Sequence, residues 1–414
     1  MSVEKVQGGK RDKLQSIICI LGSYYPLETG FSSAFQNFEK AVLKNYVVDK
    51  VYVLAPHYTE NPNIDNVIYT KLKKEKYNQI IKGLFYVRFP DHFQLLLYKQ
   101  RFREIRRRIE EISLESEVKL ILVESMFFAW AVPLIQKAFD IPVMVRIHGT
   151  GPENTKYLKD RLTNLNKALL KWTFESKYVS ATTSFYFDFF QEYWNDYNHF
   201  MNKYFFVIPN TVDFEPIPIE KKNDIVFLQL GRMDSQGYHQ KGFTDTIQAL
   251  LYIEETMDKA ILKRIRYVSI GTGENEPEFK KLLLQLKYIQ SEHYSILKNS
   301  EVKKKLAESD VIIMPSRCEG MSMFATEALA VGRAFIFTND NGLREMIRDG
   351  QNGIAIKAFD YLGMAKAIRR YIESPDLIVE YGNRSRSIFE QEYTHEKVAK
   401  KFRVVLNTIE ATRK

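Results

Sequence analysis

The sequence predicts an α/β protein with two doubly wound parallel sheets. Short apolar runs that favour strands alternate with longer segments of helical period along most of the 414 residues. Many of these runs are apolar at consecutive positions, as strands covered on both faces of a parallel sheet require. The pattern restarts near residue 222, which indicates two domains of similar size.

The expected strands are placed by their apolar runs and by the turn residues that follow them. In the first half they are Ser16–Leu21, Val47–Leu54, Leu84–Phe89, Val118–Val123, Val143–Ile147, Tyr178–Thr182 and Phe205–Ile208. In the second half they are Asp224–Leu230, Tyr267–Ile270, Val311–Met314, Ala334–Thr338 and Gly353–Ile356. Helical periods are clear over Phe31–Lys44, Phe243–Glu255 and His395–Thr412.

The segment 213–222 contains two prolines and no regular period, so it reads as a linker. We therefore predict an amino-terminal domain over 1–213, a carboxyl-side domain over 214–394, and a final helix over 395–414 that packs back on the first domain. Ligands of open α/β sheets bind beyond the carboxyl ends of the strands. The expected binding site is a central cleft between the two domains.

Composition narrows the class of protein. Hydrophobic residues make up 45% of the chain and charged residues 27%, which suits packed globular domains. No stretch approaches the ~18 apolar residues of a spanning helix, and no signal peptide is evident, so we expect a cytoplasmic protein. Cys19 and Cys318 form neither a disulfide framework nor a metal-ligand pattern. The net charge of +9 favours an anionic partner.

Two short glycine motifs follow strands of the second domain. Gly231-Arg232 ends one strand, and Lys241-Gly242 precedes a helical pattern. Two cations beside free backbone amides suit a diphosphate, although an ordinary strand-to-helix turn with solvated charges has the same pattern. Gly271 and Gly273 follow the next strand. They could let a ligand approach the backbone closely, or they could simply form a tight strand-to-helix turn.

The strongest motif runs from Glu319-Gly320 to Glu327. It follows the strand Val311–Met314 and enters a helix near Ser322, which could cap it. The first amides of that helix would stabilise an anionic leaving group. Glu319 could accept hydrogen bonds from sugar hydroxyls, and Glu327 could clamp vicinal ribose hydroxyls. The alternative reading is two solvated charges near a helix start, with Gly320 permitting close packing.

The order of these motifs resembles glycosyltransferase family 4, the retaining enzymes of the GT-B fold, in which two Rossmann-like domains face a cleft. The resemblance includes Gly342…Glu345…Gly350…Gly353 after the strand Ala334–Thr338. It also includes Ile208-Pro-Asn210-Thr-Val-Asp213 before the linker and Arg146-Ile-His148-Gly149 in the first domain. It covers about residues 16–400 and is firmer in the second half.

The resemblance implies roles for individual residues. Arg232 and Lys241 would hold the donor diphosphate, and His148 would reach the sugar near its anomeric carbon. Together with Glu319, which would contact the transferred sugar, these residues form the implied catalytic set. The implied donor-binding set contains Glu327 at the ribose, Gly320, Met321, Ser322 and Met323 at the head of the helix, Gly30 in a first-domain loop, Gly271 and Gly273. The chain departs from the family in that first-domain loop, where Thr29-Gly30 stands in place of paired glycines, and in a longer spacer between Arg232 and Lys241.

The implied activity is metal-independent transfer of a hexosyl or N-acetylhexosaminyl group, with no cofactor. The donor would be a nucleotide-sugar, with UDP-sugars favoured and GDP-sugars as the alternative. The acceptor would be a glycan, glycolipid or glycoconjugate in cell-surface polysaccharide or glycoconjugate assembly. Two other hypotheses are a non-catalytic GT-B scaffold for a partner transferase and a nucleotide-sugar epimerase.

The basic, helix-periodic segment 99–112 offers a second interpretation of the positive charge. Such a helix could lie on an anionic membrane at the inner face of the cell, which would suit a lipid-linked acceptor. The simpler interpretation is a solvated helix in which Glu104, Glu110 and Glu111 pair with arginines. Nucleic-acid binding is not expected, because no recognition motif or aromatic stacking pattern accompanies the basic residues.

Overall fold

The structure is a computed structural model that describes residues 13–21, 30–55, 64–72, 90–124, 126–148, 171–188, 203–213 and 224–413. Two predicted features lie outside this described part, namely the strand at 84–89 and nearly all of the linker at 213–222. The domain boundaries that we drew at that linker therefore stay predictions.

The first sheet has seven parallel strands in the order β3-β2-β1-β4-β5-β6-β7. Its interior strands are buried along almost their whole length, which explains their consecutive apolar residues. The strands are β1 (Gln15–Leu21), β2 (Lys50–Ala55), β3 (Val67–Lys71), β4 (Glu117–Glu124), β5 (Val143–Ile147), β6 (Tyr178–Ala181) and β7 (Tyr204–Val207).

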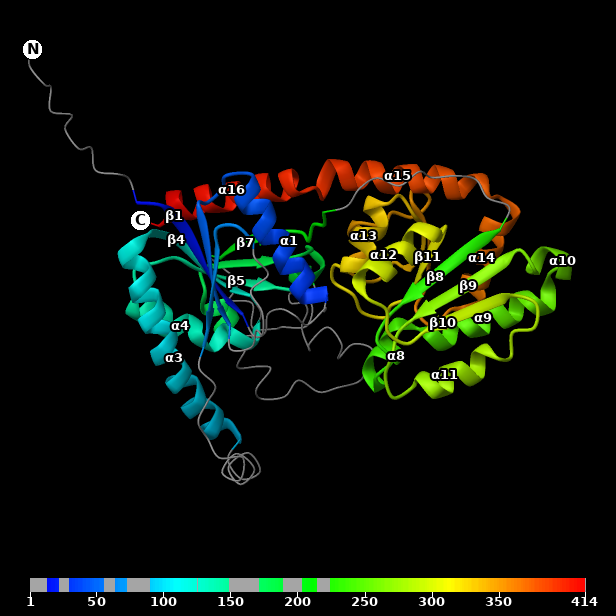
Figure 1. Cartoon of the computed structure of the whole chain (residues 1–414), viewed down its shortest axis with the longest axis horizontal. Helices are drawn as coiled ribbons and strands as arrows, with labels where there is room; N and C mark the ends of the chain where they lie inside the picture. The colour runs from blue at the N-terminus through cyan, green and yellow to red at the C-terminus, as the bar shows by residue number, and fades with distance from the viewer. Residues whose placement is uncertain are drawn as a thin grey trace, which may run out of the picture.

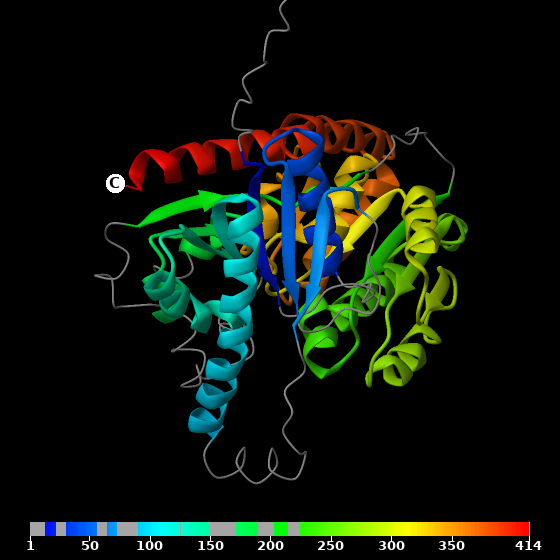
Figure 2. The same ribbon diagram turned by 60° about the vertical axis from the view of Figure 1, so that its left-hand side comes forward.

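The second sheet has six parallel strands in the order β10-β9-β8-β11-β12-β13, so the predicted pair of parallel sheets is confirmed. Helices lie on the faces of each sheet (Figures 1 and 2). The strands are β8 (Ile225–Leu230), β9 (Ile265–Ile270), β10 (Gln290–Tyr294), β11 (Val311–Met314), β12 (Ala334–Thr338) and β13 (Gly353–Ile356).

The helices of the described part connect these strands. Around the first sheet they include α1 (Gly30–Lys44), α3 (Pro90–Glu115), η1 (Met126–Ala131) and α4 (Val132–Ala138). Around the second they are α8 (Ser235–Lys241), α9 (Phe243–Thr256), α10 (Lys259–Leu262), α11 (Glu276–Leu283), α12 (Asn299–Glu308), α13 (Met323–Ala330), η3 (Gly342–Glu345), α14 (Tyr361–Glu373) and α15 (Asp376–Glu392), followed by α16 (His395–Thr412).

The strands β3 and β10 and the helix α8 had no counterpart in the sequence-based expectation. The strands β3 and β10 lie at sheet edges and are only partly buried, so their residues are mixed rather than uniformly apolar. The helix α8 fills the long spacer before Lys241, where Asp234 caps it by accepting a hydrogen bond from the Gly237 amide at 2.7 Å. A seven-residue helix gives too short a period to detect in a sequence.

The helix α16 follows the second sheet in sequence but lies along the first one (Figure 1). Five of its buried residues belong to the hydrophobic core of the first sheet, where the Phe402 and Phe38 rings meet edge to face with centroids 5.0 Å apart. These five residues are Val398, Ala399, Phe402, Val405 and Ile409. Such aromatic pairs contribute beyond their buried area, so α16 is part of that core.

The helix α3 carries the basic segment for which we considered membrane binding. In its described side chains, Arg106 pairs with Glu110, while Arg107 and Arg108 both pair with Glu111, at 2.8–2.9 Å. These contacts agree with the simpler interpretation of a solvated helix. None of the described helices is both long enough and apolar enough to cross a bilayer.

The packing of α16 predicts a large effect for Phe402→Ala. Removing this ring should lower the free energy of unfolding by about 3–5 kcal/mol, because it leaves a cavity between α16 and α1. Chemical denaturation followed by circular dichroism measures this change. The matched control is Val404→Ala on the same helix, whose side chain is 57% exposed and whose effect should stay within about 0.5 kcal/mol. Equal effects of the two substitutions would contradict the assigned packing.

Candidate functional site

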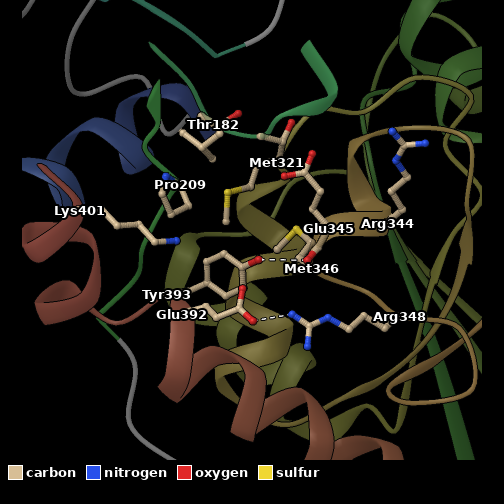
Figure 3. Close-up of a pocket in the computed structure, with 12 residues that line it drawn as sticks. Thr182, Pro209, Met321, Arg344, Glu345, Met346, Arg348, Glu392, Tyr393 and Lys401 are labelled. Carbon is tan, nitrogen blue, oxygen red and sulfur yellow. Dashed lines mark hydrogen bonds and ion pairs between the residues drawn. The ribbon is translucent and has the colours of Figure 1, made fainter. Parts of the chain in front are cut away.

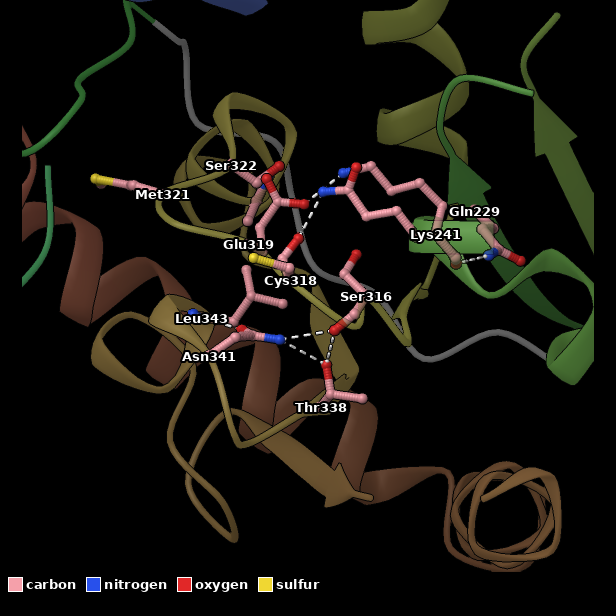
Figure 4. Close-up of polar contacts among 12 residues, drawn as sticks. Gln229, Lys241, Ser316, Cys318, Glu319, Met321, Ser322, Thr338, Asn341 and Leu343 are labelled. Carbon is pink, nitrogen blue, oxygen red and sulfur yellow. Dashed lines mark hydrogen bonds and ion pairs between the residues drawn. The ribbon is translucent and has the colours of Figure 1, made fainter. Parts of the chain in front are cut away.

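The loops that leave the carboxyl edge of the second sheet bring two of the predicted site residues into contact. Lys241, at the end of α8, forms an ion pair with Glu319, in the loop between β11 and α13 (Figure 4). Their side chains are 18% and 15% exposed, so the pair is largely shielded from water. At such low exposure, the attraction between the two charges offsets the cost of removing them from water only where the geometry of the pair is good.

Neighbouring hydrogen bonds hold this pair in place. The Glu319 carbonyl accepts from the Gly342 amide at 2.8 Å, which ties the loop after β11 to the loop after β12. Gln240 donates to the Cys318 carbonyl at 2.6 Å, and Gln229 donates to the Lys241 carbonyl at 2.8 Å. The loops after β8, β11 and β12 therefore form one connected unit around Lys241 and Glu319.

The helix α13 begins where the sequence placed it. Ser322 is its N-cap, and its hydroxyl accepts from the Ala325 amide at 3.4 Å. Gly320, Met321 and Ser322 are buried in the loop that enters the helix, and Met323 is its first residue. The amino end of α13, with its partial positive charge, thus lies directly beside the Lys241–Glu319 pair.

Glu327 lies one turn further along α13 and carries an unusual carboxyl group. The side chain is half-buried, and burial raises its pKa to about 7 against the opposing charge of Lys303. Within the described part of the chain it makes no hydrogen bond or ion pair. A buried carboxyl without a partner costs stability, and such groups concentrate at functional sites.

Arg232 stands apart from this cluster. Its side chain is 64% exposed and pairs with Asp234 two residues later, at 3.1 Å. No contact in the described residues joins it to Lys241, Glu319 or Glu327. The structure therefore brings together Lys241 and Glu319 and places Arg232 at the rim of the same sheet edge.

The glycines after β9 are explained by packing. A Cβ atom on Gly271 would lie 2.0 Å from the Gly231 carbonyl oxygen, and one on Gly273 would lie 2.1 Å from the Met233 carbonyl carbon. Side chains there would push the loops after β8 and β9 apart. The structure therefore supports the interpretation of this motif as a tight turn.

The first domain presents His148 immediately after β5. Its Nε2 contacts the Glu124 carboxylate, which ends the neighbouring strand β4 and is completely buried. Arg146, also completely buried, contacts the other Glu124 oxygen at 3.5 Å and donates to the Ile208 carbonyl at 3.2 Å. Burial lowers the pKa of His148, and the Glu124 charge opposes that effect. Glu124 thus orients the ring.

Sequence reasoning did not identify Glu124 as a functional residue. The signal available was a charged residue at the end of a buried apolar strand. Arg146 was quoted only as part of the motif around His148. Its guanidinium lies 4.5 Å from the centre of the Phe38 ring, so α1 also supports the cluster.

Tyr186 joins the two halves of the site. Its hydroxyl donates to the His148 carbonyl at 3.1 Å, and a Cβ atom on Gly320 would lie only 1.9 Å from that hydroxyl. Gly320 therefore lacks a side chain because Tyr186 occupies the space. Next to this contact, the Asn210 amide side chain donates to the Met321 carbonyl at 3.1 Å. The strand end that carries His148 and the loop that carries Glu319 are thus neighbours.

One predicted residue is only partly tested by the structure. Gly30 is the first residue of α1 rather than part of a loop, and residues 26–29 before it lie outside the described ranges. Among the described residues, no three His, Cys, Asp or Glu side chains gather as a metal site would require.

The chain is similar to known glycosyltransferases. The family model of glycosyl transferases group 1 matches residues 213–388, which contain Lys241, Glu319 and Glu327. N-acetyl-alpha-D-glucosaminyl L-malate synthase of Bacillus anthracis is 26% identical over 167 residues, which are 40% of this chain and 42% of that protein. UDP-Gal:alpha-D-GlcNAc-diphosphoundecaprenol alpha-1,3-galactosyltransferase of Escherichia coli is 26% identical over 184 residues, 40% of this chain and 44% of that protein.

These matches span less than half the length of the curated relatives. A solved structure extends the likeness to nearly the whole chain. Sucrose-phosphate synthase from Thermosynechococcus elongatus superposes with a TM-score of 0.70 at 15% identity, over 96% of this chain and 99% of that chain. At this identity the likeness concerns the fold, which is the two-sheet GT-B arrangement.

The raised pKa of Glu327 predicts how stability depends on pH. Between about pH 4.5 and pH 7 the folded protein retains a proton on Glu327 that the unfolded chain has lost, so stability falls as pH rises through this window. Glu327→Gln removes this contribution. At pH 8 the variant should be more stable than the parent protein by about 1–3 kcal/mol, and denaturant titrations at several pH values measure the difference.

The control for this experiment is Glu373→Gln, an exposed carboxyl in the last turn of α14. It should follow the parent protein to within about 0.5 kcal/mol at every pH. If Glu327→Gln also follows the parent protein, then the carboxyl of Glu327 is solvated and the assignment of its burial is wrong.

Proposed function

We propose that the protein transfers a sugar from a nucleotide-sugar to a glycan, glycolipid or glycoconjugate acceptor, on the premise that its residues 213–388 match the family model of glycosyl transferases group 1. The observation that carries the proposal is the shielded contact between Lys241 and Glu319 beside the start of α13. The site thus combines a cation and helix amides, which bind a diphosphate, with a carboxylate, which accepts hydrogen bonds from sugar hydroxyls.

Lys241 would bind the donor diphosphate and stabilise the charge that develops when the nucleotide departs. Its present partner, Glu319, would then exchange the ammonium group for the hydroxyls of the transferred sugar. In this exchange the pyrophosphate replaces the carboxylate at Lys241, and the sugar hydroxyls supply hydrogen bonds to Glu319. Arg232, at the exposed rim, would contact the same diphosphate from the solvent side.

Glu327 would accept hydrogen bonds from the ribose hydroxyls of the donor. Its lack of a partner among the described residues supports this role, because a ligand would supply the missing donors. The cost of burying this carboxyl in the free protein would be offset by the bound nucleotide. Active-site residues often carry such a stability cost.

His148 would reach the anomeric region of the sugar from the first domain. Glu124 holds its ring through Nε2, and the Tyr186 hydroxyl holds its backbone carbonyl. We propose retention of anomeric configuration, by attack of the acceptor hydroxyl on the face from which the nucleotide leaves. The charge of the leaving group would be balanced by Lys241, Arg232 and the α13 amides, so the proposed transfer needs no metal ion and no cofactor.

The donor is proposed to be a UDP-sugar that carries a hexose or N-acetylhexosamine, with a GDP-sugar as the alternative. The name of the Escherichia coli relative contains a UDP-sugar donor and a lipid diphosphate acceptor, which supports assembly of a cell-surface glycan. A cytoplasmic location with peripheral contact at the inner membrane face through 99–112 would suit such an acceptor, and this location is part of the proposal.

The experiment that tests this function begins with thermal-shift measurements across UDP-, GDP- and ADP-sugars. The sugar nucleotide that stabilises the protein is then incubated with and without acceptors, and the products are analysed. Lys241→Met should reduce transfer by about 100-fold or more, because it removes a charge that acts on the leaving group. Lys281→Met, an exposed lysine of α11, is the matched control and should retain full transfer.

The outcomes separate the alternatives. Undiminished transfer in Lys241→Met would refute the assigned site. Conversion of the sugar without any acceptor would identify an epimerase. If no nucleotide-sugar stabilises the parent protein and no transfer is detected, the chain is a non-catalytic relative.

A further inference from the structure

A cavity of about 370 Å³ lies where three parts of the fold meet (Figure 3). The loop after β6 and the end of β7 line one side, the residues around η3 line another, and the crossing from α15 to α16 closes it. Of the predicted donor-site residues, only Met321 lines this cavity. Figure 4 shows the Met321 side chain directed away from Lys241 and Glu319, so the cavity is separate from the donor site.

The cavity contains hydrogen-bond donors that lack acceptors. The hydroxyls of Thr182 and Thr183 are buried, with the residues 1% and 2% exposed, and neither has a hydrogen-bond partner among the residues that the structure describes. Lys401 extends from α16 into the cavity (Figure 3) and forms no ion pair or hydrogen bond within the described residues. Burial lowers the pKa of Lys401, and the charges of Glu392 and Glu345 oppose that effect without forming an ion pair with it among the described residues.

The acceptors around the cavity are already engaged. Glu345 accepts from the Ser184 amide and hydroxyl, both at 3.0 Å, and from the Phe185 amide at 2.8 Å. Glu392 pairs with Arg348 (Figure 3). The missing partner is therefore a group that accepts hydrogen bonds from an ammonium group and two hydroxyls.

We propose that this junction cavity is a binding site for a small oxyanion, of which inorganic phosphate is the simplest member. An oxyanion would accept from Lys401, Thr182 and Thr183 together, and its charge would balance that of Lys401. The inference does not depend on the proposed transferase activity. Because the walls come from both sheets and from α16, a bound oxyanion would stabilise their present arrangement.

The test is a phosphate titration of the full chain at constant ionic strength, followed by calorimetry. Four proteins are compared, namely the parent protein, Lys401→Met, Lys400→Met and Lys241→Met. Lys400 is the exposed neighbour on α16, so its variant controls for net charge, and Lys241→Met removes the cation of the donor site. We expect saturable binding that weakens by about tenfold or more in Lys401→Met alone.

Two results would overturn the proposal. One is the absence of saturable phosphate binding to the parent protein. The other is binding that is weakened by Lys241→Met and unchanged by Lys401→Met, since phosphate would then occupy the donor site. Thr182→Val provides a second variant of nearly unchanged shape, in which the loss of one hydroxyl should weaken binding by about fivefold. Circular dichroism and thermal unfolding confirm that each variant is folded.

Discussion

The ion pair between Lys241 and Glu319 joins two loops that are 78 residues apart in sequence. Their positions follow from the parallel sheet, because the loops after β8 and β11 leave neighbouring strands at the same edge. The charges of Lys241 and Glu319 neutralise each other while the two loops remain in contact. In the proposed function, a donor phosphate would have to replace the Glu319 carboxylate as the partner of Lys241.

Much of the fold could be predicted from the sequence because its interior strands carry a simple signal. Residues such as Ile17, Leu122 and Ile313 face packed layers on both sides of a sheet, so their strands are apolar throughout. The edge strands β3 and β10 carry no such signal, since one side of each remains open to solvent. Their formation depends on pairing with β2 and β9, which a local pattern cannot reveal.

The residues of the candidate site likewise fall into those that a local sequence pattern indicates and those that it does not. Lys241, Glu319 and the capping residue Ser322 were found because they lie in short motifs at strand ends. Tyr186 and Glu124 were not, because their importance arises from contacts that cross the structure: Tyr186 fills the space beside Gly320, and Glu124 meets His148 from an adjacent strand. The exposure of Arg232 depends on the path of α8, which the motif spacing does not determine.

The position of α16 has a consequence for how the chain is made. Phe402 and its neighbours complete the core of the first sheet, yet they leave the ribosome after every strand of the second sheet. Translation proceeds at about 5–20 residues per second, so the apolar surface of α1 that receives α16 stays uncovered for many seconds in each nascent chain. The core of the first sheet can therefore be completed only after the rest of the chain has been synthesised.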